Sequence, residues 1–363
     1  MKVVHISFSD HTGGAAIAAY RHNEAMNRAG IDSKMIIVHS RNFQGGKVQR
    51  VCANELYVRL RMFLQQQFSK AIVHFFSPQI QFTYANVGFN LAANKTLKNA
   101  DIIFVHWINA GIVSIKGIEK ILKIGKPLYW FMHDMWPMTG GCHYTFDCDK
   151  YTTQCNICPM LKKASDKDIS QKQFSAKMTC WQKYNNLHVV APSKWLSVCA
   201  ASSTIFSRKK NYIVPNVIDT DKFIICDKTE ARTILNLPQN KKLLLFGAMD
   251  VNSPYKGWSL LEKSINELAI PDVECVIFGK CDKRQLSASL NKKVHFMGTL
   301  QDENVLVLLY NAVDLVLLPS LAENYPNVIL EGMACGTPAV AFNVGGVSDL
   351  VIHKSTGYLA ENR

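Results

Sequence analysis

The chain has 363 residues, 48% of them hydrophobic, and its mean hydropathy is close to zero. It is too long for a single hydrophobic core and too apolar to be disordered, so two globular domains are expected. Its 41 Lys and Arg residues outnumber its 28 Asp and Glu residues, which gives a net charge of +13. This balance favours anionic partners such as a nucleotide or an acidic membrane surface.

The beginning of the chain shows no signal peptide, because Met1 and Lys2 lead directly into a predicted strand, Val3 to Ser7. Together with 11 cysteines, an odd number, this indicates a reducing cytoplasm in which thiols stay free or bind metal. No apolar run reaches the roughly 18 residues that cross a bilayer. We therefore expect a cytoplasmic protein that meets the inner face of the membrane at most peripherally.

A loop containing Gly13 and Gly14 follows the first predicted strand and leads into a helix of small residues, Ala15 to Ala19. Such a loop lets the backbone approach a phosphate closely, although a Gly-Gly pair is more often only a tight turn. There is no GxGxxG motif and no P-loop lysine, which argues against a dehydrogenase or a nucleoside triphosphatase.

The segment from Glu55 to Phe82 is basic and aromatic, most densely between Tyr57 and Phe76. Its apolar residues do not form one clean stripe, so two interpretations stay open. The segment is either a core helix with a solvated basic face or a contact for an anionic membrane or lipid-linked acceptor. No nucleic-acid-binding motif occurs, so no nucleic acid partner is expected.

Two predicted strands end in histidines. Ile102 to Val105 leads to His106, and Leu128 to Phe131 leads to His133-Asp134. The carboxyl ends of strands in an α/β sheet are where ligand-facing groups lie, so both histidines are candidate site residues.

An insertion at 140–160 follows, with four cysteines within seventeen residues: Cys142, Cys148, Cys155 and Cys158. Their number and the closing C-x-x-C favour a structural zinc ion, with His143 as a substitute for Cys142. A redox pair formed by the last two cysteines, or free surface thiols, are the alternatives. A helix is expected over 175–186.

In the second half, a strand from Leu243 to Phe246 precedes a loop with Lys256, a position from which a lysine can meet a diphosphate. The stretch from Asp314 to Gly346 then predicts a β-loop-α-β unit. Its strands, Leu315 to Leu318 and Ala339 to Phe342, are short and apolar enough to be buried on both faces. Pro326 suits the first position of the helix, and Gly336 suits a left-handed residue just past its end.

Two carboxylates bracket the start of that helix. Glu323 precedes it, and Glu331 lies about five residues inside it, roughly 7–8 Å along its axis. With the positive helix N-terminus between them, this spacing suits a nucleotide-diphosphate-sugar, which has ribose, two phosphates and sugar in a row. Taken alone, the spacing leaves open that Glu323 is solvated and that Glu331 is an ordinary surface residue of the helix.

Glu323 and Glu331, followed by the turn Gly336-Thr337-Pro338 and by Gly345-Gly346, resemble the E-x7-E signature of retaining GT-B glycosyltransferases. The resemblance is to family four, whose members build bacterial surface polysaccharides. It extends over nearly the whole chain. His133-Asp134 resembles the active-site histidine motif of the family, and the segment from Pro215 to Asp219 is similar to the hinge between its two domains.

The resemblance implies an α/β fold of the GT-B type, with two Rossmann-like domains facing a cleft. Residues 1–215 would form the acceptor-side domain, which carries the insertion, and residues 216–363 the domain that binds the nucleotide-sugar. The implied activity is that of a hexosyltransferase, which moves a sugar from a nucleotide-diphosphate-sugar to a carbohydrate or lipid-linked acceptor with retention of configuration.

The resemblance also assigns roles to individual residues. His133 and Glu323 would contact the transferred sugar and Glu331 the ribose. The diphosphate would meet the residues Gly13, Gly14, Lys256 and Asn327. An arginine usual in the family is replaced by Ala248 here. Fixed positive groups take the place of a metal in this arrangement, so no catalytic metal is expected.

The chain stops at Arg363, where members of the family continue for one or two helices, so we expect either a short form or a truncated one. Other functions stay open. One is a GT-B epimerase or phosphorylase, and the chain shows a signature for neither. Another is a catalytically weak, glycosyltransferase-like scaffold that the basic segment holds at the membrane.

Overall fold

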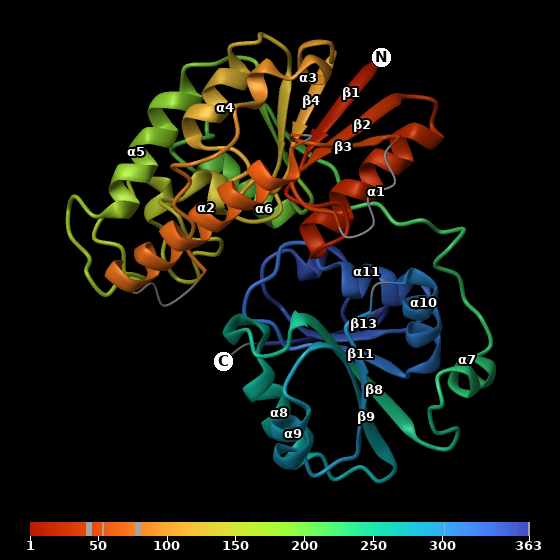
Figure 1. Ribbon diagram of the computed structural model, residues 1–363. Helices are drawn as coiled ribbons and strands as arrows, with labels where there is room; N and C mark the ends of the chain where they lie inside the picture. Colours follow the sequence, from red (N-terminus) through yellow and green to blue (C-terminus); the bar gives the residue numbers. More distant parts are fainter. Residues whose placement is uncertain (41–45, 53, 77–80, 301, 362–363) are drawn as a thin grey trace. The chain divides into compact units, whose positions relative to one another are not determined.

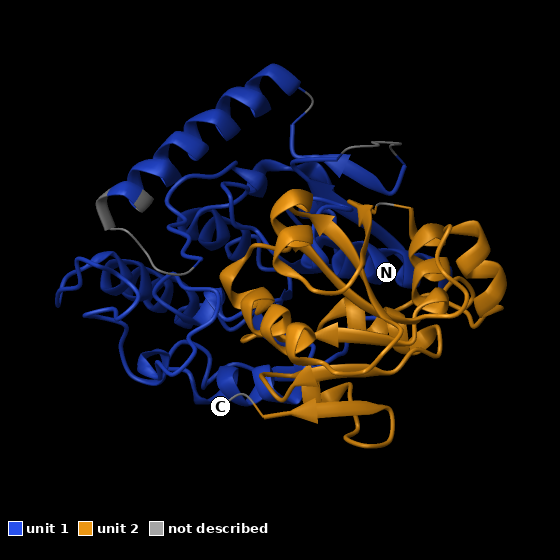
Figure 2. Ribbon diagram, turned by 90° about the horizontal axis from the view of Figure 1, so that it is seen from below, with its two compact units in different colours: residues 1–217 blue, residues 218–363 orange. Residues whose placement is uncertain are grey.

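The computed structural model describes residues 1–40, 46–52, 54–76, 81–300 and 302–361 (Figure 1). They form two compact units, residues 1–217 and residues 218–363 (Figure 2). Sequence analysis placed the boundary between residues 215 and 216. Each unit is a parallel sheet with helices, and each is Rossmann-like.

Unit 1 has a sheet of seven strands in its described part, in the order β3-β2-β1-β4-β5-β6-β7. The strands are β1 (Lys2–Ile6), β2 (Asp32–Ile37), β3 (Val48–Arg50), β4 (Ile102–Val105), β5 (Leu128–Phe131), β6 (Leu187–Ala191) and β7 (Asn211–Ile213). The α-helices are α1 (Gly14–Arg28), α2 (Glu55–Phe76), α3 (Lys95–Lys98), α4 (Ile115–Leu122), α5 (Ile169–Gln182) and α6 (Lys194–Ser202). All neighbouring strands pair in parallel, so their carboxyl ends meet at one edge of the sheet.

Unit 2 has six described strands in the order β10-β9-β8-β11-β12-β13, again all parallel. The strands are β8 (Lys242–Asp250), β9 (Val273–Lys280), β10 (Val294–Gly298), β11 (Leu315–Leu318), β12 (Ala339–Phe342) and β13 (Gly357–Ala360). The α-helices are α7 (Lys228–Ile234), α8 (Trp258–Glu267), α9 (Lys283–Ser289), α10 (Glu303–Ala312) and α11 (Asn327–Ala334). β11 and β12 are therefore neighbours, joined through α11 as the β-loop-α-β unit requires.

Four strands have the bounds predicted from sequence: β4, β5, β11 and β12. Each is a run of four residues that are apolar or aromatic. β5 and β11 bury side chains on both sides of the sheet, whereas β4 and β12 bury them on one side and are half-buried on the other. Trp130 of β5 shows the depth of the core, with 1% of its surface exposed, and it packs against Trp181 of α5.

The helix expected over 175–186 was placed wrongly, because α5 begins at Ile169 and ends at Gln182. Asp168 caps its N-terminus, accepting hydrogen bonds from the backbone N–H groups of Ser170 and Gln171 at 2.9 and 3.1 Å. An aspartate in this position is a standard helix start, and the polar composition of the segment concealed it.

α2 occupies the basic and aromatic segment and runs along the outside of unit 1 (Figure 1). Val58, Met62 and Ile72 pack against clusters of buried side chains, so one face of the helix is a core face. The side chains of Phe75 and Phe76 lie outside the described part of the structure. No helix among the described residues combines the length and the apolar character needed to span a bilayer.

Candidate active site

A lysine and a glutamate predicted from sequence meet at the carboxyl ends of β8 and β11. Lys256 closes the 3-10 turn η4 (Pro254–Lys256), and Glu323 lies between β11 and α11. Lys256 Nζ lies 2.5 Å from Glu323 Oε1, and Glu323 is only 6% exposed. Burial by itself would lower the pKa of Lys256, but the charge of Glu323, helped by Tyr255, outweighs burial and raises it. The glutamate thus keeps a poorly solvated lysine charged.

The meeting of these two loops depends on Gly257, which follows η4. Its φ is +72°, and a Cβ atom there would lie 1.8 Å from the carbonyl oxygen of Pro319 at the end of β11. Leu321 N–H also donates to the carbonyl of Tyr255 at 2.8 Å. A residue without a side chain is therefore required for the two loops to touch.

Glu331 lies inside α11 and is 4% exposed. The hydroxyl of Tyr310, from α10, donates a hydrogen bond to Glu331 Oε2 at 2.7 Å. The burial of Glu331 and Glu323 contradicts the alternative in which both are ordinary solvated residues.

The C-terminal end of α11 lies where the sequence predicted it, whereas its N-terminal end differs from the prediction by one residue. Pro326 is the N-cap and not the first helical residue, which is Asn327. At the other end Gly336 has a φ of +78°, and its N–H donates to Met333 O at 3.0 Å. The N–H of Thr337 donates to the carbonyl of Gly332 at 2.8 Å, which completes the motif that commonly ends helices at a glycine.

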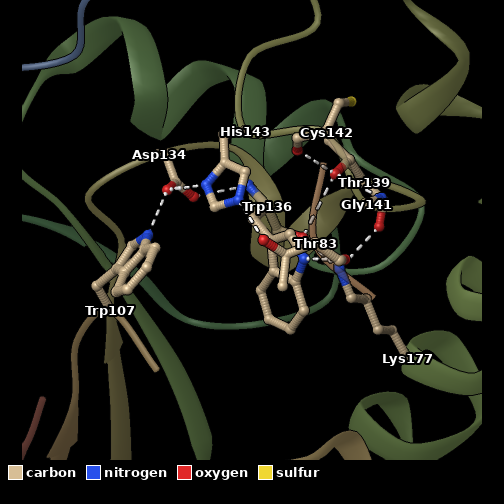
Figure 3. A network of polar contacts seen from close by, with 9 residues as sticks. All are labelled: Thr83, Trp107, Asp134, Trp136, Thr139, Gly141, Cys142, His143 and Lys177. Carbon is tan, nitrogen blue, oxygen red and sulfur yellow. Dashed lines mark hydrogen bonds and ion pairs between the residues drawn. The ribbon is translucent and has the colours of Figure 1, made fainter. Parts of the chain in front are cut away.

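In unit 1, His133 and Asp134 follow β5, and the aspartate is a structural anchor (Figure 3). One of its oxygens faces His143 Nδ1 at 2.6 Å and accepts from Trp107 Nε1 at 3.2 Å, and the other accepts from Trp136 N–H at 2.9 Å. Burial opposes its ionisation, but the interaction with His143 and the N–H of Trp136 keep the pKa of Asp134 below its usual value. Asp134 therefore shapes the loop beside His133.

Gly13 caps α1 in unit 1, and its φ of +92° is one that favours glycine. Its carbonyl accepts hydrogen bonds from the N–H groups of Ala16 and Ile17 at 3.1 and 3.0 Å. Gly13 and Gly14 thus form the turn between β1 and α1 that the sequence predicted, and their contact with a phosphate stays a prediction.

The four cysteines of the insertion line one small cavity together with Phe82, Lys150 and Ser170. Among the described residues, however, no group of three or more His, Cys, Asp or Glu side chains is arranged to hold a metal ion, so the structure does not support the expected zinc site. Burial raises the pKa of Cys155 to about 12 and also raises that of Cys158. Both are therefore protonated thiols, unlike the low-pKa cysteines of redox enzymes.

The sequence suggested His143 as a substitute metal ligand for Cys142, but in the structure the His143 ring has other partners. Its Nδ1 faces Asp134, and its Nε2 lies 2.9 Å from the hydroxyl of Thr83. Both ring nitrogens are thus engaged in hydrogen bonds (Figure 3).

Comparison with known proteins identifies the type of the second unit. Residues 240–363, about a third of the chain, match the family model of glycosyl transferases group 1. The *Escherichia coli* K12 chain WcaC, named as a colanic acid biosynthesis glycosyl transferase, is 25% identical over 73% of this chain and 64% of its own length. An uncharacterised glycosyltransferase of *Methanocaldococcus jannaschii* is 26% identical over 75% of this chain and 74% of its own.

Solved structures extend the likeness to nearly the whole chain. Sucrose-phosphate synthase from *Thermosynechococcus elongatus* has a TM-score of 0.63 at 17% identity, covering 99% of this chain and 86% of its own. *Anabaena* HepE, in complex with UDP and glucose, gives a TM-score of 0.63 at 16% identity, with the same coverage of both chains. The fold is GT-B.

Within this GT-B chain, the structure brings Lys256 and Glu323 into direct contact and places Asn327 and Glu331 on one helix of the same unit. Sequence analysis missed Lys177, which is fully buried. Its Nζ lies 3.5 Å from the centre of the Trp136 ring and donates to the carbonyl of Thr139 at 2.9 Å (Figure 3). His5 was missed as well. It lies inside the apolar strand β1, and its one sequence signal is that a polar residue stands among apolar ones.

Substituting Gly257→Ala should destabilise unit 2 by at least about 2 kcal/mol, because the added Cβ meets Pro319 O and the left-handed backbone is strained. Gly125→Ala is the matched control, with a φ of +84° and open space around the added atom, so it should cost only about 1 kcal/mol. Urea denaturation of both variants measures the difference. Equal losses of stability would contradict a close contact at Gly257.

Proposed function

We propose that the chain is a retaining glycosyltransferase that moves a sugar from a nucleotide-diphosphate-sugar to a carbohydrate or lipid-linked acceptor in surface polysaccharide biosynthesis. The observation that carries the proposal is the ion pair of the half-buried Lys256 with the buried Glu323 at the carboxyl edge of a parallel sheet, beside the N-terminus of α11. The group 1 match of residues 240–363 and the glycosyltransferase relatives support it. HepE, whose structures contain UDP or UDP-glucose, supports the choice of donor class.

In this proposal the diphosphate lies against Lys256 and the backbone N–H groups at the start of α11, near Asn327. Glu323 and His133 contact the sugar, Glu331 contacts the ribose, and the turn with Gly13 and Gly14 faces the diphosphate. Because Lys256 is already paired with Glu323, an arriving diphosphate competes with this carboxylate for the lysine. Donor binding would then release Glu323 towards the sugar.

Transfer creates negative charge on the departing nucleoside diphosphate. A fixed lysine and helix N–H groups stabilise such charge without having to reorganise during the reaction. The proposal therefore needs no catalytic metal. Retention of configuration is the outcome implied by the family that the carboxylate pair resembles.

The two carboxylates should have separable effects on donor turnover. Glu323→Ala should mainly lower kcat, because only Glu323 is assigned to the reacting sugar, whereas Glu331→Gln should mainly raise the KM for the donor. Steady-state kinetics of sugar transfer and donor hydrolysis, with UDP-sugars tested first, measure both.

Tyr310→Phe is the control for Glu331, since it removes the hydrogen bond to that carboxylate but leaves the carboxylate itself. It should cost roughly 1 kcal/mol of stability and change the donor KM less than Glu331→Gln does. Near-wild-type kinetics in both carboxylate variants would overturn the assignment. Absence of any transfer by the wild-type chain with a broad set of donors would favour a scaffold.

We also propose that α2 makes a peripheral contact with anionic membranes. Leu56, Leu60, Phe63 and Leu64 are each more than half exposed, and their spacing places them on one face of the helix. Exposed basic residues of α2, among them Lys70, and the net charge of +13 add attraction to acidic lipids.

Phe63→Ser should therefore weaken co-sedimentation with vesicles that contain acidic lipid, and salt should weaken it further because the attraction is electrostatic. Val198→Ser is the control, since Val198 is an exposed apolar residue of another helix in unit 1, with 67% of its surface exposed. Equal binding to neutral and acidic vesicles, or an equal effect of both substitutions, would leave α2 as a packing helix only.

A structural zinc ion in the insertion remains a proposal, based on the chemistry of four thiols around one cavity. Binding would require the thiols to lose their protons and close around the ion. Metal-replete, reduced protein should then contain one equivalent of zinc by elemental analysis. Cys148→Ser should lose it and Cys52→Ser, outside the insertion, should keep it. Zinc-free wild-type protein, or a disulfide between Cys155 and Cys158, refutes the proposal.

A further inference from the structure

Three histidines form a hydrogen-bonded row across the sheet of unit 1. His5 Nδ1 lies 2.8 Å from His106 Nε2, and His106 Nδ1 lies 2.9 Å from His133 Nε2. Successive rings stack at centroid distances of 5.1 and 5.2 Å. His5 and His106 are almost fully buried, with 0% and 1% of their surfaces exposed, whereas His133 is half-buried at the end of the row.

The sheet itself creates this row. β1, β4 and β5 are neighbours, and His5 is in register with Phe104, which is in register with Tyr129. His106 lies two residues beyond Phe104, and His133 four residues beyond Tyr129, so alternation along the strands keeps all three histidines on one face. Each histidine stands one strand over and two residues further along than the one before it.

All three rings are neutral. Burial lowers the pKa of His5 to about 3, with a smaller effect from His22, and burial lowers the pKa of His133 to about 3 against the opposing charge of Asp134. Burial likewise holds the pKa of His106 well below its usual value. A neutral imidazole has one ring N–H, so the row has three protons for six ring nitrogens.

Only two proton arrangements satisfy both hydrogen bonds. If His106 carries its proton on Nδ1, it donates to His133, so the proton of His133 is on Nδ1 and that of His5 is on Nδ1. If His106 carries its proton on Nε2, all three rings have their protons on Nε2. The three tautomers are therefore coupled. The tautomer of His5 determines whether Nδ1 of His133, two strands away, is a hydrogen-bond donor or an acceptor.

We propose that His5 and His106 are positioning residues that hold His133 with its proton on Nδ1, so that His133 is a hydrogen-bond donor to an oxygen of the sugar. This inference rests on the proposed function for the identity of the ligand. The direction follows from the inner end of the row, where His5 Nε2 is buried and has no hydrogen-bond partner among the residues that the structure describes. The opposite arrangement would bury an unpaired N–H there, and such orphan N–H groups are rare in proteins.

The small cavity at the outer end of the row favours the same direction. His133 and Asn109 both line it, and Asn109 Oδ1 is a buried acceptor without a hydrogen-bond partner in the described part of the chain. A sugar hydroxyl can donate to Asn109 Oδ1 and accept from His133 Nδ1–H. If His133 also presented an acceptor, the single proton of that hydroxyl would satisfy only one of the two.

The test is the tautomeric state of the three rings in the full chain, read from long-range ¹H–¹⁵N correlation spectra of histidine side chains without ligand. The 11 histidines are assigned from the signals lost in single variants. We expect His5, His106 and His133 each to show the Nδ1–H form, which has the non-protonated nitrogen at Nε2. Three Nε2–H rings, a mixture of the two forms, or a charged ring among the three would overturn the proposal.

Variants of His5 test the coupling. His5→Asp replaces the first donor by an acceptor, so the rings of His106 and His133 should change to the Nε2–H form, whereas His5→Asn, whose amide can donate from nearly the same place, should keep them as Nδ1–H. His22→Phe is the matched control. His22 packs 6.5 Å from the His106 ring on the same face without a hydrogen bond to it, so its loss should leave the tautomers unchanged. An unchanged His133 in folded His5→Asp protein would refute the role of His5.

Kinetics with an active donor separate positioning from general damage. His5→Asp should lower kcat roughly 2- to 10-fold, the effect of one lost hydrogen bond from His133, and His5→Asn should keep most of the wild-type kcat. Unchanged kcat in His5→Asp would contradict the positioning role. Failure of every donor with the wild-type chain would overturn the proposed function alone, because the spectra are recorded without donor.

Discussion

Both units depend on one geometric constraint, the parallel pairing of their strands. In a parallel sheet every strand delivers its last residues to the same edge, so residues distant in sequence become neighbours there. In unit 1 this constraint gathers the residues after β4 and β5, His106 and His133, into a row that begins at His5 within β1. In unit 2 it gathers the loops after β8 and β11, which bring Lys256 to Glu323. The chemistry proposed for the protein lies entirely at these two edges.

Charge is compensated locally at each edge, and in different ways. Unit 2 pairs a half-buried cation with a buried anion, so Lys256 keeps its charge although little water reaches it. Unit 1 instead keeps the imidazoles of the row neutral and joins them by hydrogen bonds to one another, while Asp134 receives three donors at its two oxygens. The first arrangement is suited to a ligand that carries charge, because an anion can replace the glutamate beside the lysine. The second arrangement is suited to uncharged polar groups, because neutral imidazoles offer directed hydrogen bonds without a net charge.

Much of the fold could be predicted because its signals are local. Four-residue apolar runs such as Leu315–Leu318 identify strands buried on both faces, and a Gly336-Pro338 pair identifies a helix end within a few residues. The spacing of Glu323 and Glu331 likewise carried the hypothesis for the site. What could not be predicted depends on contacts between distant segments. No local pattern reveals that Glu323 takes Lys256 as its partner, that His143 turns to Asp134, or that His5 lies under His106. The start of α5 was a different error, since the Asp168 cap was visible in the sequence.

The ring of His143 has a consequence for the insertion at 140–160. One nitrogen reaches back to Asp134, beside His133, and the other reaches Thr83, from a segment that precedes the insertion by some sixty residues. The backbone of Met135 also donates to the carbonyl of His143 at 2.9 Å, which closes the loop between them. The insertion is thus a cross-brace within unit 1 and not an appendage. If the insertion were replaced by the equivalent segment of a relative, the fold of this region would be preserved only if the residue at position 83 were replaced as well.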